Sequence, residues 1–296
     1  MEHLKGTGVA LVTPFTKDLS IDVKALESIV EHCINGGVDY LVILGTTAES
    51  ATLSKVEKQQ VMDTVVRANA GRLPLVLGVG GNDTAKVIED LQTLNLSYFM
   101  AVLSVSPYYN RPTQEGIYQH FKAVAQSSPK PIVLYNVPSR TGSNILAETT
   151  LRLAHDFSNI IAIKEASGDM AQIEGIIRDR PQDFLVISGD DFTALPTVLA
   201  GGDGVISVLG QGLPELFSKM MDLGMAGDSQ SAYAIHHQLR PLMQLIFEEG
   251  NPAGIKSVLE NVALGSAVVR LPLVEASASL KNRIGTFLKT LNPALA

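Results

Sequence analysis

The sequence has little of several features that mark particular classes of protein. It holds one cysteine, Cys33, so no disulfide can form within the chain, which fits a reducing compartment such as the cytoplasm. No apolar run approaches the roughly 20 residues of a transmembrane helix, and the first residues lack the basic and apolar segments of a signal peptide. The histidines are scattered, without the spacing of metal ligands. We therefore expect a cytoplasmic protein with no membrane partner and no metal.

The chain also lacks an excess of positive charge. Its net charge is −7, so no basic surface is implied, and nucleic acid is excluded as the main partner. An anionic small molecule is not excluded, because it needs only a local positive site. With 46% hydrophobic and 18% charged residues, the chain has the composition of a folded protein with a large core.

Short apolar strands alternate with helical patterns through most of the chain, which predicts a parallel sheet. Eight such units in about 225 residues fit a closed (β/α)8 barrel, the TIM barrel, better than an open sheet. The strands are expected at residues 8–14, 40–44, 74–79, 98–105, 131–135, 160–164, 184–188 and 204–208. The helices between them are expected from about residue 22, from about residue 54, and at 85–95, 115–127, 147–155, 170–179 and 192–200.

The alternation stops after Leu223. Residues 228–248, 252–264 and 277–291 have helical patterns with no strand between them. We therefore predict two domains, a catalytic barrel over 1–225 and a small helical domain over 226–296.

One lysine stands where α/β enzymes place their chemistry. Four apolar residues lead directly into Lys164, which would lie at the carboxyl end of a strand buried on both faces. Burial among apolar side chains favours the neutral, nucleophilic amine, so Lys164 is a candidate for Schiff-base chemistry. The alternative is a structural lysine that reaches water or pairs with Glu165.

The other loops after the strands carry groups that suit chemistry through an imine. Tyrosine and threonine hydroxyls can relay the protons that imine formation needs. The turn Gly45–Thr47 enters a helix and offers backbone N–H groups to a carboxylate. Arg140, on the loop after the fifth strand, has the planar, two-pronged cation that a second carboxylate prefers.

These residues also have structural interpretations. Thr46 and Thr47 could bond to their own turn, and Tyr108 and Tyr109 could be core or interface aromatics. The glycines after the seventh and eighth strands fall where many barrels bind phosphate, yet the acidic pair Asp190–Asp191 would repel one.

Four motifs, in this order and at the ends of these strands, resemble the dihydrodipicolinate synthase family of pyruvate-dependent class I aldolases, which also holds N-acetylneuraminate lyase. The resemblance runs from Gly6 to the last helices. The tyrosine pair and Arg140 favour the synthases over their sugar-acid relatives. The motifs are Gly45-Thr-Thr-Ala-Glu-Ser50, Pro107-Tyr-Tyr-Asn-Arg-Pro112, Tyr135-Asn-Val-Pro-Ser-Arg-Thr-Gly142 and Ile163-Lys-Glu-Ala-Ser-Gly168.

The resemblance implies a role for each site residue. It implies that Lys164 forms an imine with pyruvate without any external cofactor, and that Tyr135 transfers protons above it. Thr46 and Tyr109 would complete a hydroxyl relay, with Tyr109 supplied by a neighbouring subunit. It further implies a lyase of lysine biosynthesis by the diaminopimelate route that condenses pyruvate with L-aspartate 4-semialdehyde, usually as a homotetramer built from two dimers. The implied substrate contacts are Thr47 at the pyruvate carboxylate, Arg140 at the carboxylate of the aldehyde, and Gly189 and Ile206 along the pyruvate pocket.

The chain departs from the family's pattern in two places. Ala48 replaces a glycine of the first motif, and we expect the anion site to survive if the turn needs no positive φ there. Lys55, Lys58 and Lys86 replace two histidines and a glutamate that bind lysine in feedback-sensitive members. We therefore expect little or no inhibition by lysine.

Two other functions stay open from the sequence alone. One is a Schiff-base aldolase that acts on a 2-keto-3-deoxy sugar acid or on N-acetylneuraminate. The other is a non-catalytic barrel that binds a small acid and regulates a partner.

Overall fold

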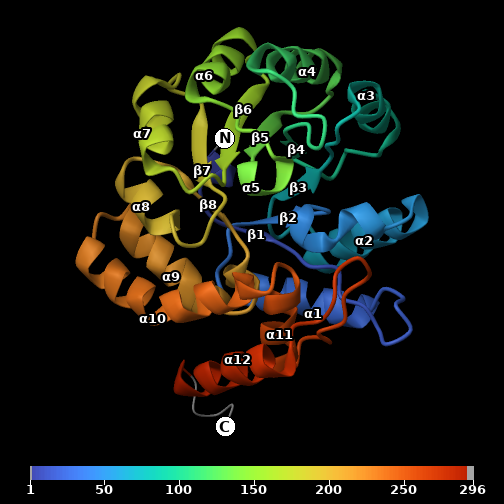
Figure 1. The fold of residues 1–296 in the computed structure, drawn as a ribbon, viewed down its shortest axis with the longest axis vertical. Helices are drawn as coiled ribbons and strands as arrows, with labels where there is room; N and C mark the ends of the chain where they lie inside the picture. Colours follow the sequence, from blue (N-terminus) through green and yellow to red (C-terminus); the bar gives the residue numbers. More distant parts are fainter. Residues whose placement is uncertain (1, 292–296) are drawn as a thin grey trace.

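The computed structural model describes residues 2–291 and is a closed barrel of eight parallel strands in sequential order, as predicted (Figure 1). Each strand pairs with its two neighbours in the chain, and β1 closes the ring against β8. The strands are β1 (Gly6–Ala10), β2 (Tyr40–Ile43), β3 (Leu75–Gly78), β4 (Ala101–Val105), β5 (Ile132–Asn136), β6 (Ile160–Glu165), β7 (Leu185–Ser188) and β8 (Gly204–Ser207).

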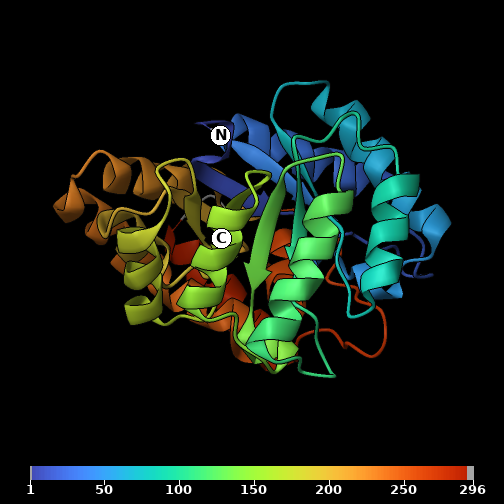
Figure 2. The same cartoon turned by 90° about the horizontal axis from the view of Figure 1, so that it is seen from above.

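Helices surround the strands in Figure 1, and the view from above in Figure 2 shows strands running between helices on both sides. The α-helices are α1 (Val23–Asn35), α2 (Lys55–Asn69), α3 (Thr84–Thr93), α4 (Gln114–Ser127), α5 (Pro138–Thr141), α6 (Ala147–Asp156), α7 (Met170–Asp179), α8 (Ala194–Leu199), α9 (Pro214–Met225), α10 (Ser229–Glu248), α11 (Ala253–Asn261) and α12 (Ala278–Leu291). The short 3-10 helices are η1 (Glu2–Leu4), η2 (Thr46–Ala48), η3 (Ser50–Thr52) and η4 (Leu209–Gln211).

The strands bury both faces, because alternate side chains point into the barrel and out toward the helices. The inward set forms a core of its own, which includes Tyr40 and Tyr135. A Cβ on Gly8 would lie 2.2 Å from the Tyr40 ring, so only glycine leaves room for this aromatic inside the barrel.

Three predicted boundaries were wrong by three residues or more. The first strand ends at Ala10 rather than at residue 14. The fourth strand begins at Ala101 rather than residue 98, because a turn precedes it, in which Phe99 N–H donates to Leu96 O, and Tyr98 is exposed. The helix predicted to reach residue 264 ends at Asn261, because Ala263 takes a left-handed φ of 59°. The chain then returns toward the barrel, where Arg270 contacts the loop that follows β2.

Helices α10, α11 and α12 pack on one another beside the barrel, and α10 lies along α9 (Figure 1). The division of the chain into two domains at residue 225 stays a prediction. Lys256 on α11 forms a buried ion pair with Glu49 in the loop after β2, so the helices and the barrel share contacts. Between residues 2 and 291, no helix has both the length and the apolar character needed to cross a membrane.

His120 gives the fold a defined response to acid. Its side chain is buried on α4, with Nδ1 2.9 Å from the hydroxyl of Thr84, and burial lowers its pKa from 6.5 to about 4. Between these two values the unfolded chain binds a proton that the folded chain does not, so stability falls as the pH falls. We expect this group to cost about 2 kcal/mol of unfolding free energy between pH 7 and 4.5.

Urea unfolding of wild type and His120→Gln at both pH values measures this cost. The variant should lose less stability on acidification than wild type does. An equal loss in the two proteins would contradict the assignment to His120.

Candidate active site

Lys164 lies at the end of β6 with its side chain inside the barrel, as the sequence predicts. The residue is 5% exposed, and it pairs in register with Tyr135 on β5. Its Nζ lies 4.3 Å from the centroid of the Tyr135 ring. The amine thus lies against the face of the Tyr135 ring in a buried position, an arrangement that suits a nucleophile with a tyrosine beside it.

Glu165 is not the partner of Lys164, so that structural alternative is wrong. Consecutive residues on a strand point to opposite faces, and the Glu165 carboxylate lies outside the barrel. It accepts hydrogen bonds from the side chains of Asn136 and Gln172 and from the backbone of Ser167. Burial raises its pKa, and these hydrogen bonds oppose the shift. The network joins the ends of β5 and β6 directly behind Tyr135 and Lys164.

The turn after β2 is fixed by backbone geometry on both sides. Leu44 and Glu49 take left-handed φ values of 56° and 52°, while Ala48 has no positive φ. The turn therefore needs no positive φ at residue 48, so alanine fits there in place of the family's glycine. The hydroxyl of Thr13 donates to Ala48 O at 2.8 Å, which anchors the middle of the turn to the segment that follows β1.

Asn251, from the segment between α10 and α11, connects two of the predicted binding residues. Its side-chain amide donates to the Thr47 hydroxyl at 2.9 Å, and its backbone oxygen accepts from the Arg140 guanidinium at 3.2 Å. Because the Thr47 oxygen is already an acceptor, its own O–H is available to donate to a carboxylate. Arg140 is exposed and forms no ion pair with any side chain of residues 2–291. Its guanidinium is therefore available to a ligand.

A buried ion pair ties this turn to the C-terminal helices. Lys256 on α11 places Nζ 2.5 Å from a carboxylate oxygen of Glu49, and both side chains are 1% exposed. The other oxygen of Glu49 accepts from the backbone N–H of Arg270 at 2.9 Å. Lys256 also donates to Val268 O and lies over the Phe15 ring. Glu49, the left-handed residue that ends the turn, is therefore fixed by the Lys256 ammonium group and by the backbone of Arg270.

Of the two residues expected along the pyruvate pocket, Gly189 lies against the Lys164 stem and Ile206 lies in the inward core of the barrel. A Cβ on Gly189 would lie 3.0 Å from both Cγ and Cε of Lys164, so the glycine allows the lysine stem to pass. Ile206 is 1% exposed and belongs to the inward core of the barrel together with Tyr135.

Tyr109 is the one predicted site residue that lies away from the others. It is 90% exposed, with a left-handed φ of 74°, so it is no core aromatic. Its neighbour Tyr108 is held through its backbone oxygen, which accepts from Asn82. Within its own chain, Tyr109 does not complete a relay with Tyr135.

A cavity of about 370 Å³ lies between helices α2 and α3, strands β3 and β4 and the loops after β2 and β3. Thr46 and Tyr135 both line it, as do Lys55, Lys58 and Lys86. Lys86 forms ion pairs with Glu89 and Asp90. The cavity therefore joins two members of the predicted relay to a wall rich in ammonium groups.

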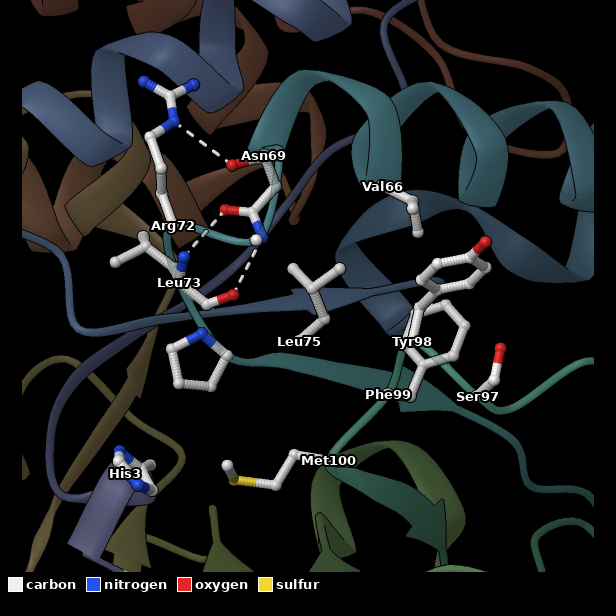
Figure 3. A pocket seen from close by; sticks show the side chains of 12 residues that line it. His3, Val66, Asn69, Arg72, Leu73, Leu75, Ser97, Tyr98, Phe99 and Met100 are labelled. Atoms are coloured by element: carbon white, nitrogen blue, oxygen red, sulfur yellow. Dashed lines mark hydrogen bonds between the residues drawn. The ribbon is translucent and has the colours of Figure 1, made fainter.

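A larger cavity, of about 520 Å³, lies at the other end of the strands, next to the starts of β3 and β4 (Figure 3). The hydrogen bonds drawn there join Arg72 and Leu73 to Asn69 and thus close the loop after α2. This is the amino-terminal end of the barrel, where residues serve stability rather than catalysis. The smaller cavity, which Thr46 and Tyr135 line but Lys164 itself does not, is therefore the better candidate for a substrate site.

Sequence reasoning missed Asn251 and Lys256. Both lie about 200 residues from their partners in the turn, and no local pattern marks either of them.

The histidines that the structure describes are not grouped with acidic side chains as metal ligands. The ring of His236 lies next to the rings of Tyr233 and His237. Among residues 2–291, no three histidine, cysteine or acidic side chains are grouped as metal ligands.

Comparison with known proteins gives consistent matches along the whole chain. The profile of the Dihydrodipicolinate synthetase family matches residues 3–291. The 4-hydroxy-tetrahydrodipicolinate synthase of Flavobacterium psychrophilum is 59% identical over 292 residues, which are 99% of this chain and all of the relative. That of Parabacteroides distasonis is 51% identical over 98% of both chains. The crystal structure of dihydrodipicolinate synthase from Thermotoga maritima, 37% identical, matches with a TM-score of 0.94 over 99% of both chains.

Proposed function

The chain belongs to the dihydrodipicolinate synthetase family, and we propose that its reaction runs through a Schiff base on Lys164. The reaction is that of 4-hydroxy-tetrahydrodipicolinate synthase, a lyase of lysine biosynthesis that condenses pyruvate with L-aspartate 4-semialdehyde. The observation that carries the proposal is the buried Lys164 amine at the end of β6, 4.3 Å from the centre of the Tyr135 ring.

The Lys164 amine attacks the keto carbon of pyruvate, and loss of water gives the imine. A proton then leaves the pyruvate methyl group, and the enamine attacks the aldehyde carbon of the second substrate. Attack by the amine of that substrate on the imine carbon closes the ring and frees Lys164. The imine itself is the electron sink, so we propose that the chain needs no external cofactor.

Tyr135 and Thr46 move the protons of these steps, since both line the same cavity. We propose that Tyr109 of a second copy completes the relay, in a homotetramer built from two dimers. The exposure of Tyr109 in the single chain supports this proposal, because a tyrosine that is 90% exposed is free to enter a neighbour's site. We also propose a cytoplasmic location, since the single cysteine is buried and reduced.

The pyruvate carboxylate lies at the turn after β2, where the Thr47 hydroxyl and the adjoining backbone N–H groups donate to it. Asn251 keeps that hydroxyl oriented. We propose that Gly189 and Ile206 border the pyruvate methyl group, since Gly189 lies against the lysine stem and Ile206 belongs to the inward core of the barrel.

Arg140 is expected to bind the carboxylate of the semialdehyde. Arg140→Ala should raise KM for this substrate by about 10- to 100-fold, as expected for loss of a charge-assisted hydrogen bond, and leave KM for pyruvate nearly unchanged. Steady-state kinetics with each substrate varied in turn measures the difference.

Arg152→Ala is the matched control, because this exposed arginine pairs with Glu115 on α4, away from the strand ends. A nearly silent Arg140→Ala would favour the alternative aldolase that acts on a sugar acid.

Lysine is expected to inhibit weakly or not at all. Lys55 and Lys58 line the cavity beside Thr46 and repel a cationic ligand, whereas Glu89 and Asp90 offset the charge of Lys86. Two like charges about 6 Å apart repel by roughly 3 kcal/mol at an effective dielectric constant near 20. A titration of turnover with L-lysine up to millimolar concentrations tests this, and strong inhibition would show that the lysines point away from the ligand.

A further inference from the structure

Asp191, in the loop after β7, is a fully buried carboxylate that the mechanism does not use. Its Oδ1 accepts from the Ser207 hydroxyl at 2.6 Å and from the Val208 N–H at 3.2 Å. Its Oδ2 accepts from the Leu209 N–H at 2.9 Å. No cation pairs with it among residues 2–291. These three donors, which we call the anion cradle, therefore stabilise the carboxylate without a paired cation.

The anion cradle lies where barrel enzymes commonly hold phosphate, on the loops after the seventh and eighth strands. Here the chain fills this position with a carboxylate of its own. Burial raises the pKa of Asp191 to about 6, against the hydrogen bonds from Ser207 and Leu209, so the group is ionised at pH 8. Asp190 lies beside it but turns its carboxylate to Thr193 instead.

Asp191 joins the loop after β7 to the end of β8, and these segments carry Gly189 and Ile206. Gly189 stands two residues before it and contacts the lysine stem, and Ile206 immediately precedes Ser207. Ser207 in turn accepts from the Gly210 N–H at 2.8 Å, which extends the link into η4. A shift of either loop would change the space around the imine.

We propose that Asp191 is a built-in anion that occupies the phosphate position of this barrel, and that it positions Gly189 and Ile206 around Lys164. Asp191 is thus a positioning residue, which acts through the two loops and touches no substrate. With the anion cradle filled, its donors are closed to phosphorylated ligands, and carboxylic acids are bound at the turn after β2 instead. The effect on rate rests on the proposed function of Lys164, whereas the effect on stability does not.

Asp191→Ala tests the proposal because it empties the anion cradle and leaves its donors in place. Formate is the probe, since it is the missing carboxylate without its methylene group. At pH 8 we expect Asp191→Ala to unfold about 5 °C or more below wild type and to turn over about 10- to 100-fold more slowly. Sodium formate should raise both values in a saturable way, compared with sodium chloride of equal ionic strength.

Two controls separate a filled cradle from a general salt effect. Asp191→Asn keeps the size of the side chain and Ser207→Ala keeps the carboxylate, so neither should respond to formate. If formate acts equally on all variants, or Asp191→Ala behaves as wild type, the proposal is overturned. Inorganic phosphate should likewise stabilise only Asp191→Ala, and equal stabilisation of wild type would contradict a filled cradle.

Should Asp191→Ala fail to stay folded, refolding yields in formate and in chloride decide the matter. A higher yield in formate supports the proposal, and equal yields overturn it. Failure of the proposed function is a separate result. In that case the wild-type protein would form no covalent adduct with pyruvate. The response of Asp191→Ala to formate would still test the anion cradle.

Discussion

Lys164→Met is expected to abolish condensation, lowering kcat by on the order of 10³-fold or more. Without the amine no imine forms, and losing a covalent intermediate removes at least about 4 kcal/mol of transition-state stabilisation. Methionine has nearly the length of the lysine stem and no charge, so it suits a site that is 5% exposed. The protein should therefore stay folded while it loses activity. Initial rates with both substrates, measured beside a thermal unfolding curve, separate these two effects.

Lys219→Met is the matched control, since this lysine lies on an exposed position of α9. It should turn over as wild type does. If Lys164→Met kept more than about a tenth of the wild-type rate, less than roughly 1.4 kcal/mol would depend on the amine, and Schiff-base catalysis at this residue would be wrong.

The second large effect is on stability. Lys256→Met should lower the unfolding free energy by about 3–5 kcal/mol, because it leaves the Glu49 carboxylate buried without its cation. The same change should loosen the turn that binds the pyruvate carboxylate, since Glu49 ends that turn in a left-handed conformation. We therefore expect a higher KM for pyruvate as well. Urea unfolding and pyruvate saturation curves measure the two effects.

Two further variants test the cause. Glu49→Gln combined with Lys256→Met removes both charges, and it should be more stable than Lys256→Met alone, because no uncompensated charge remains. Arg283→Met breaks an exposed ion pair with Glu248 on α10, and it should cost less than about 1 kcal/mol. Equal costs for Arg283→Met and Lys256→Met would show that burial of the pair does not matter.

The sequence predicts what depends on local patterns. Ser54 and Glu57 are three residues apart, a spacing typical of a capping box, and both hydrogen bonds of that box are present at the start of α2. Lys164 was placed correctly, because a buried strand and the turn after it are both visible in ten consecutive residues. The order of the strands followed from the alternation of strand and helix.

Local patterns fail where a residue finds its partner far along the chain. Nothing near Lys256 predicts that its ammonium group meets Glu49, 207 residues away, inside the protein. The sequence shows the acidic pair at 190–191, but not that Asp191 accepts hydrogen bonds from Ser207 and Leu209 after β8. Tyr98 was assigned to a strand because it precedes an apolar run, yet a turn excludes it.

The most direct test of the central claim is the intact mass of the protein after it is mixed with pyruvate and reduced with borohydride. Wild type and Lys164→Met are treated side by side. We predict a single reduced pyruvyl adduct on wild type, located at Lys164 by peptide mapping, and no adduct on the variant. Folded wild type that gains no mass, or an adduct at another lysine, would contradict the assignment of Lys164 as the Schiff-base residue.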